Sequence, residues 1–163
     1  MAKRLKLRAE DEEDLKTISA ILQDALVTVA DMAYLPEDRR FVLVANRFRW
    51  ETEPDLLAAA DGGEEDCPPG PVFERILTGL CFDGVTGVRL KNIDRRRRSQ
   101  ILELLHLGWT SGCLTLTFAG GGAIRLETTR ISCRLDDMCE PWPTLSRPRH
   151  DVESDEAETG GRR

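Results

Sequence analysis

The chain has 163 residues, 40% of them hydrophobic, which is long enough for one domain with a hydrophobic core and short for two. Its formal net charge of −6 is unevenly spread, because residues 51–66 carry −7 and residues 151–163 carry −3, which leaves +4 for the remainder. No window of about 18 consecutive apolar residues occurs, so a membrane-spanning helix is excluded.

The cysteine pattern argues against both a disulfide framework and a zinc ribbon. The count is odd, no pair has CxxC spacing, and no apolar N-terminal segment of the signal-peptide type precedes them. Only His106 and His150 could activate a thiol, so a catalytic cysteine is not expected. We therefore expect reduced thiols in a cytoplasmic protein, with no metal and no other cofactor. The cysteines are Cys67, Cys81, Cys113, Cys133 and Cys139.

The N-terminal residues predict a strand followed by a helix. Basic and apolar residues alternate over 3–8, which is typical of a short strand with one wet face. Apolar residues at helical spacing, preceded by an aspartate that can cap the first turn, predict a helix over 11–23. The apolar residues are Leu15, Ile18 and Leu22, and the capping residue is Asp11.

Two segments rich in β-formers, 26–35 and 40–50, flank the turn that begins at Pro36. Proline presets the backbone angle of such a turn, so the two segments predict an antiparallel hairpin. Residues 51–71 then collect proline, glycine and acidic side chains. This composition predicts a mobile acidic insertion within a single globular domain that covers residues 1–150.

Strand patterns resume over 72–82 and 87–92, on either side of the turn dipeptide Asp83-Gly84. The segment 101–109 is compatible with a helix or a strand. Its alternation favours a strand. The alternating residues are Ile101, Glu103, Leu105, Leu107 and Trp109.

Residues 114–126 (LTLTFAGGGAIRL) contain two alternating apolar runs joined by three glycines, which predicts a β-hairpin rather than a phosphate-binding loop. The strand over 123–135 changes its apolar parity between Leu126 and Ile131. A shift of one residue turns every side chain to the other face, so a bulge or bend is expected near 128–130.

The fold class that these elements predict is α+β and mainly antiparallel. We expect about seven or eight strands in a roll, a sandwich or a pleckstrin-homology-like arrangement, with one N-terminal helix over one face. Phe118, Ile124 and Trp142 are predicted core residues, and the Pro141-Trp142-Pro143 run is expected to be extended but outside regular sheet. Residues 151–163 are predicted to be a disordered acidic tail.

Two basic segments are candidate sites for an anionic ligand or a partner. In the first, Arg47 and Arg49 alternate with Phe48 and Trp50. Alternation from the preceding valines places the two aromatic residues in the core and leaves both arginines outside, where they could contact a partner.

The second basic segment is the run Arg95, Arg96, Arg97 and Arg98, which lies in a predicted loop. Its four charges equal the whole excess of +4 in the folded part. The run is a candidate contact for phosphate, an acidic partner or the chain's own acidic segment over 51–66.

Four stretches stand in one order along the chain: ISAILQDALVTVADMAYLPEDRRFVLVANRFRWE, LTGLCFDGV, LTFAGGGAIRLE and PWPTLSRPRH. Together they resemble an uncharacterised bacterial family, the domain of unknown function 2948. The resemblance covers residues 3–150 and implies a single cytoplasmic domain. The family carries no assigned activity, cofactor or functional residue, so the resemblance implies no function.

The leading hypothesis for function is a non-enzymatic cytoplasmic binding or assembly module whose partner is another protein. It is favoured because no group of residues in the sequence forms a recognisable catalytic constellation. Two alternatives stay open. One is an enzyme with an unrecognised carboxylate or thiol site, and the other is a nucleic-acid-associated protein that uses Arg47, Arg49 and the Arg95–Arg98 loop.

Overall fold

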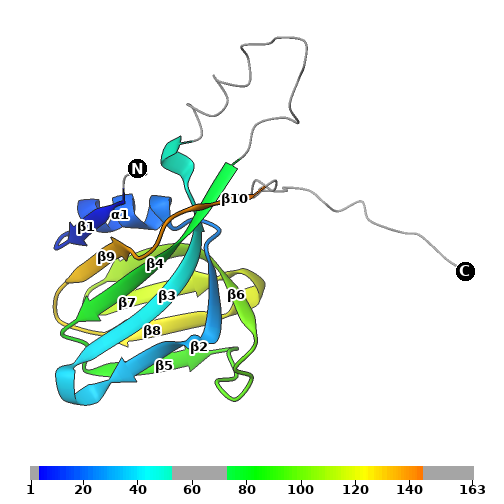
Figure 1. Cartoon of the computed structure of the whole chain (residues 1–163). Coiled ribbons are helices and arrows are strands. Elements are labelled where there is room, and N and C mark those ends of the chain that lie inside the picture. Colours follow the sequence, from blue (N-terminus) through cyan, green and yellow to red (C-terminus); the bar gives the residue numbers. More distant parts are fainter. Residues whose placement is uncertain (1–3, 53–72, 145–163) are drawn as a thin grey trace, which may run out of the picture.

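A computed structural model of the protein describes residues 4–52 and 73–144 (Figure 1). Within these two ranges it has ten strands and one α-helix, and every strand pair is antiparallel. The predicted fold class, α+β with a mainly antiparallel sheet and one N-terminal helix, is therefore confirmed. In the described ranges, no helix has the length and the apolar character needed to span a membrane.

The chain begins with strand β1 (Lys6–Ala9) and helix α1 (Glu12–Ile21). Asp11 caps the helix as predicted, because its side chain accepts a hydrogen bond of 2.8 Å from the backbone N–H of Asp14. The apolar stripe of α1 is buried against the sheet. The backbone N–H of Leu107 donates to the hydroxyl of Ser19 at 2.9 Å, which joins the helix to the later strand β6 (Ile101–Thr110).

Strands β2 (Leu26–Leu35), β3 (Arg40–Phe48) and β4 (Phe73–Asp83) follow one another across the sheet. A short 3-10 turn over Pro36–Asp38 joins β2 to β3, which confirms the predicted hairpin. Strands β3 and β4 stay paired from Arg40 to Phe48. The connection between them includes residues 53–72, which lie outside the described residues, as do Cys67 and the predicted tail over 151–163.

The second part of the sheet contains β6 and the hairpin that the glycine run predicts. The hairpin strands are β7 (Cys113–Phe118) and β8 (Ala123–Glu127), and strand β5 (Gly87–Lys91) pairs with β8. The 101–109 segment is a strand, as favoured. The alternation does not run through the whole strand, because Leu105 is an extra residue in the register with β7 and reverses it, and Ile101 is exposed.

The expected bend near 128–130 separates two strands rather than kinking one. After β8 the chain crosses to the other part of the sheet and forms β9 (Cys133–Asp137), which pairs with β4 and β1. The last strand, β10 (Trp142–Thr144), pairs with the edge of β4, so the prediction that this run lies outside regular sheet is wrong. A sheet edge tolerates proline because its missing N–H need not donate to a ladder.

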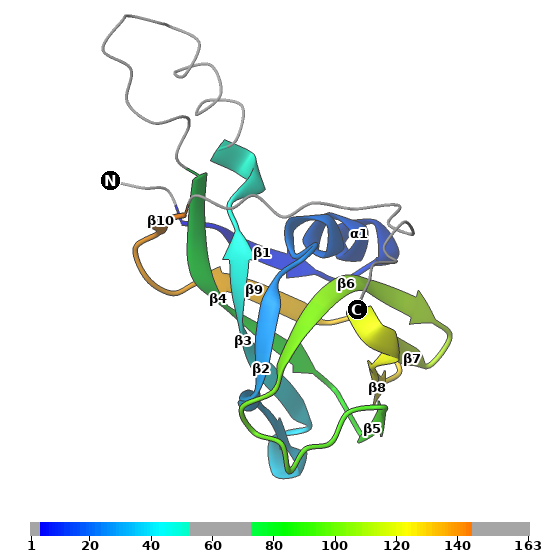
Figure 2. The same cartoon turned by 90° about the vertical axis from the view of Figure 1, so that its right-hand side faces the viewer.

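The strand order is β1-β9-β4-β3-β2-β6-β7-β8-β5, with β10 beside β4. Figures 1 and 2 show this sheet curling into an open roll, with α1 across one end. Phe118 and Ile124 belong to the core inside the roll, as predicted. Trp142 is only half-buried on β10 and is not part of that core, so this prediction is wrong.

Candidate functional site

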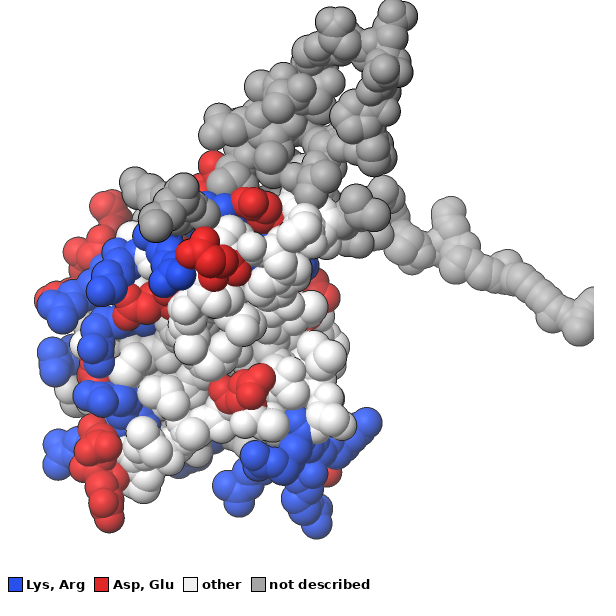
Figure 3. All heavy atoms as spheres, in the orientation of Figure 1, with Lys and Arg blue, Asp and Glu red and all other residues white. Residues whose placement is uncertain are grey.

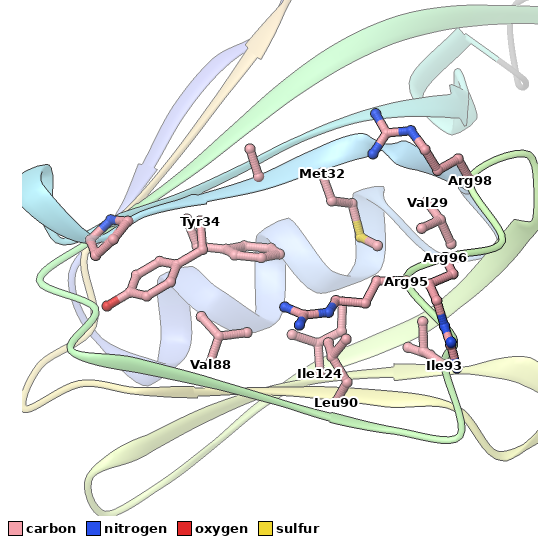
Figure 4. A pocket seen from close by; sticks show the side chains of 13 residues that line it. Val29, Met32, Tyr34, Val88, Leu90, Ile93, Arg95, Arg96, Arg98 and Ile124 are labelled. Carbon is pink, nitrogen blue, oxygen red and sulfur yellow. The ribbon is translucent and has the colours of Figure 1, made fainter.

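A groove of about 500 Å³ opens in the wall of the roll between β2 and β5 (Figure 4). We call it the β2–β5 groove. Met32 and Tyr34 line it from β2, and Val88 and Leu90 line it from β5. Its deeper surface is formed by buried core residues that include Phe41 and Ile124. The groove is therefore an apolar opening that reaches the core of the molecule.

The groove exists because β2 leaves its neighbour β6 early. The two strands pair only over Leu26 to Thr28, and the register of β2 against β3 shifts between Val27 and Met32. Within this bulge, the N–H of Ala30 donates to the carbonyl of Arg98 at 3.0 Å, so a loop replaces β6 beside β2. Strand β5 is the last strand of the sheet, and it does not close the gap.

The loop over residues 92–100, which we call the arginine loop, closes one end of the groove. Figure 4 shows Arg95, Arg96 and Arg98 beside the apolar side chains, and all three line the groove. Arg97 lines a neighbouring hollow with Asp94. The four side chains are exposed, as the sequence predicts, and Figure 3 shows a cluster of basic side chains at the lower right.

A local turn shapes the arginine loop. The carboxylate of Asp94 accepts a hydrogen bond of 3.0 Å from the backbone N–H of Arg96, and the carbonyl of Asp94 accepts one of 3.0 Å from the N–H of Arg97. Aspartate forms such turns readily. The Arg96 guanidinium also lies 3.5 Å from the same carboxylate, but its side chain is 92% exposed, so water screens this pair.

The other two candidate arginines are buried, so the prediction that they lie outside is wrong. Arg47 is 0% exposed, and its guanidinium donates to Asp137 at 2.8 Å and to Glu51 at 2.9 Å. Arg49 is also buried and forms an ion pair with Glu74. From Phe41 to Ala45, strand β3 is apolar on both faces, so its alternation could not show which face is internal. The true core face carries Phe41, Leu43, Ala45 and Arg47.

Asp137 holds the centre of this buried cluster. Burial raises its pKa, but hydrogen bonds from Arg47, Thr78 and the backbone N–H of Leu5 outweigh that effect, so the pKa lies below its ordinary value. Glu51 behaves in the same way, because its bonds from Arg47 outweigh burial. Glu51 lies within the predicted acidic insertion over 51–71, yet it belongs to a 3-10 turn over Trp50–Thr52 and bonds to the buried Arg47. The cluster therefore links strands β3, β4 and β9 to the residue before β1 and to the turn over Trp50–Thr52.

The thiols in the described residues are all free. Burial raises the pKa of Cys133 to about 12 and also raises that of Cys81, which keeps both thiols protonated at neutral pH. Within residues 4–52 and 73–144, no three histidine, cysteine, aspartate or glutamate side chains come together to hold a metal ion.

Sequence reasoning missed the apolar walls of the groove. Val88 and Leu90 alternate with Arg89 and Lys91 along β5, which shows one apolar face but not what that face borders. The bulge in β2 that opens the groove does leave a signal, because the apolar side chains change parity from Val27 and Val29 to Met32 and Tyr34, but the prediction of the hairpin did not use it. Only the association of β2, β5 and the arginine loop defines the site.

The curled sheet, the helix and the groove together define a small α+β protein with an open antiparallel roll. The chain belongs to the family described as Protein of unknown function (DUF2948), whose model matches residues 5–150. No curated protein and no solved structure matches it.

Proposed function

We propose that this chain is a non-enzymatic binding or assembly module of the cytoplasm, which holds an acidic segment of a partner protein in the β2–β5 groove. The observation that carries the proposal is the position of Arg95, Arg96 and Arg98 at the rim of an apolar opening. Apolar contacts supply affinity at such a surface, and rim charges select and steer a complementary partner. An acidic segment with apolar side chains meets both requirements.

The chemistry of the lining supports binding over catalysis. Of the described residues that line the groove, none carries a carboxylate, an imidazole or a thiol. These are the groups that most often act as general acids, general bases or nucleophiles. The nucleic-acid alternative is also weaker, because Arg47 and Arg49 form ion pairs inside the fold. Of the basic residues proposed to contact nucleic acid, only those of the arginine loop are then accessible.

We expect serine at all four arginines of the loop to weaken binding of an acidic segment at least about tenfold, because several rim ion pairs are lost together. The probe is a phage-displayed library of random 12-residue peptides, selected on the parent protein. The affinity of each enriched peptide is then measured by fluorescence anisotropy for the parent and the variant. The enriched peptides should be rich in aspartate and glutamate.

A matched control carries serine at four other exposed basic residues and has the same net charge. These residues are Lys6, Arg8, Lys16 and Arg125. The affinity of this control for the peptides should lie within about twofold of the parent's affinity, since its substitutions remove only long-range electrostatic attraction. Equal affinity for the parent and the arginine-loop variant would contradict the proposal. Steeply salt-dependent binding of single-stranded RNA that the loop variant alone loses would favour the nucleic-acid alternative.

A further inference from the structure

We propose that the partner segment binds as an added β-strand along the free edge of β5, so that the sheet is extended across the β2–β5 groove. This inference rests on the proposed function and specifies how the same groove recognises its partner. Extended segments bind in this way when a sheet edge offers backbone groups beside pockets for alternate side chains.

The direction of the β5 backbone groups follows from the β7–β8 hairpin. The N–H of Phe118 donates to the carbonyl of Gly122 at 2.9 Å, and the N–H of Thr128 donates to the carbonyl of Gly112 at 3.1 Å. Backbone groups alternate between the two sides of an antiparallel strand. The even-numbered residues of β8 therefore bond to β7, and its odd-numbered residues face β5.

The register between β8 and β5 then assigns the edge. The odd-numbered β8 residues lie opposite Gly87, Arg89 and Lys91, so these three use their backbone groups within the sheet. The N–H and C=O groups of Val88 and Leu90 point the other way, toward the free edge. In the described part of the chain, no strand pairs with this edge.

The same two residues also present their side chains to the groove. Val88 and Leu90 both line it, whereas the exposed Arg89 and Lys91 alternate with them. The edge of β5 thus offers two backbone pairing positions and an apolar surface. Charged outward side chains are a common means of preventing an exposed edge from aggregating, and they leave the edge open to a specific partner.

The two ends of the groove differ, which orients the added strand. At one end the hydroxyl of Tyr34 donates to the carbonyl of Val85 at 3.2 Å and links the two walls. At the other end stands the arginine loop, which follows Lys91 directly (Figure 4). We therefore assign to the partner a segment with alternating apolar residues over the groove and acidic residues at the arginine end. The rim charges favour carboxylates there over a neutral strand.

The test uses peptides enriched on the parent protein and a proline variant. In Val88→Pro the N–H that points to the free edge is removed while the ladder with β8 is kept, and edge strands tolerate proline at such positions. We expect the peptides to bind Val88→Pro at least about tenfold more weakly than the parent. The control Val88→Ala retains the backbone N–H, so its loss of peptide affinity should be smaller than that of Val88→Pro. Circular dichroism and the urea midpoint check that both variants fold.

Backbone N-methylation of the enriched peptides tests the same pairing without changing the protein. Methyl groups at alternate residues should abolish binding, whereas methyl groups at the intervening residues should be tolerated, since an added strand uses every second amide. This series decides the question if Val88→Pro does not fold. Tolerance at every position would overturn strand addition, and the proposed function would stand if the arginine-loop variant still loses binding.

Two other outcomes would overturn the partner segment itself. If no peptide binds the parent better than the arginine-loop variant, the proposed function fails and strand addition fails with it. If the full-length protein dimerises in sedimentation experiments and Val88→Pro abolishes the dimer, the edge is occupied by a second copy of this chain. That result would overturn a partner protein as the occupant.

Discussion

Phe118→Ala is expected to lower the free energy of unfolding by about 3–5 kcal/mol, which is typical of removing a buried phenylalanine ring. Phe118 is 1% exposed and ends β7, where it lies opposite Leu104 and belongs to the main core. Urea unfolding followed by intrinsic fluorescence measures the change. The large effect follows because the ring leaves a cavity that the neighbouring strands cannot fill.

Thr117→Ala is the matched control for Phe118→Ala. Thr117 is the preceding residue of β7 and is only half-buried, because alternation turns it to the other face. Its substitution should change the free energy of unfolding by less than about 1 kcal/mol. A loss below about 1 kcal/mol for Phe118→Ala would show that the ring is not packed as the structure has it.

Asp137→Asn is expected to destabilise the protein by about 3–5 kcal/mol, because it leaves the buried guanidinium of Arg47 with much less negative charge around it. Both side chains of this pair are 0% exposed, and their shortest N–O distance is 2.8 Å. Urea unfolding provides the measurement. Asp136→Asn, one residue earlier and half-buried, should stay within about 0.5 kcal/mol of the parent. Equal losses in the two variants would contradict a specific role for the buried pair.

The buried carboxylates also predict how stability depends on pH. The pKa values of Asp137 and Glu51 are lower in the folded protein than their ordinary value of about 4. The unfolded chain therefore takes up protons first as the pH falls. Their contribution to stability is complete above about pH 5 and is lost as the pH drops through 4 toward the folded values.

Unfolding free energies measured from pH 7 to pH 3 check this dependence. The free energy of unfolding of the parent should be constant near neutral pH and should decrease below about pH 4. Asp137→Asn should lose less over the same interval, since one of the linked carboxylates is gone. A parallel decline in the parent and the variant would mean that other groups cause the acid sensitivity. Asp83 is one such group, because its bonds from Arg40 and Arg134 outweigh its burial and lower its pKa.

The elements with a strong local signal were predicted correctly from the sequence. Helix α1 has an N-cap and apolar residues at helical spacing, and the β7–β8 hairpin has alternation on both sides of a glycine turn. Gly120 and Gly121 have φ values of +85° and +92°, which glycine adopts without strain. Such features depend on residues a few positions apart, so the sequence alone determines them.

The face of a strand could not be predicted where local patterns were equal or interrupted. The two faces of β3 are both apolar from Phe41 to Ala45, and the extra residue Leu105 reverses the alternation in β6. The position of Arg47 depends on Asp137, which is 90 residues away in the chain. A buried guanidinium is stable only beside a carboxylate that the fold brings to it. No pattern in the neighbouring sequence identifies that carboxylate.

The amino-acid sequence by itself determined the order and type of most elements, the charge of the arginine loop and the apolar face of β5. Tertiary structure alone decided that β2 leaves β6 after Thr28, that β5 stays unpaired on one side, and that the arginine loop stands between them. The physical reason is that secondary structure follows from contacts within a few residues. A groove forms from three segments whose distance in space depends on packing across the whole core.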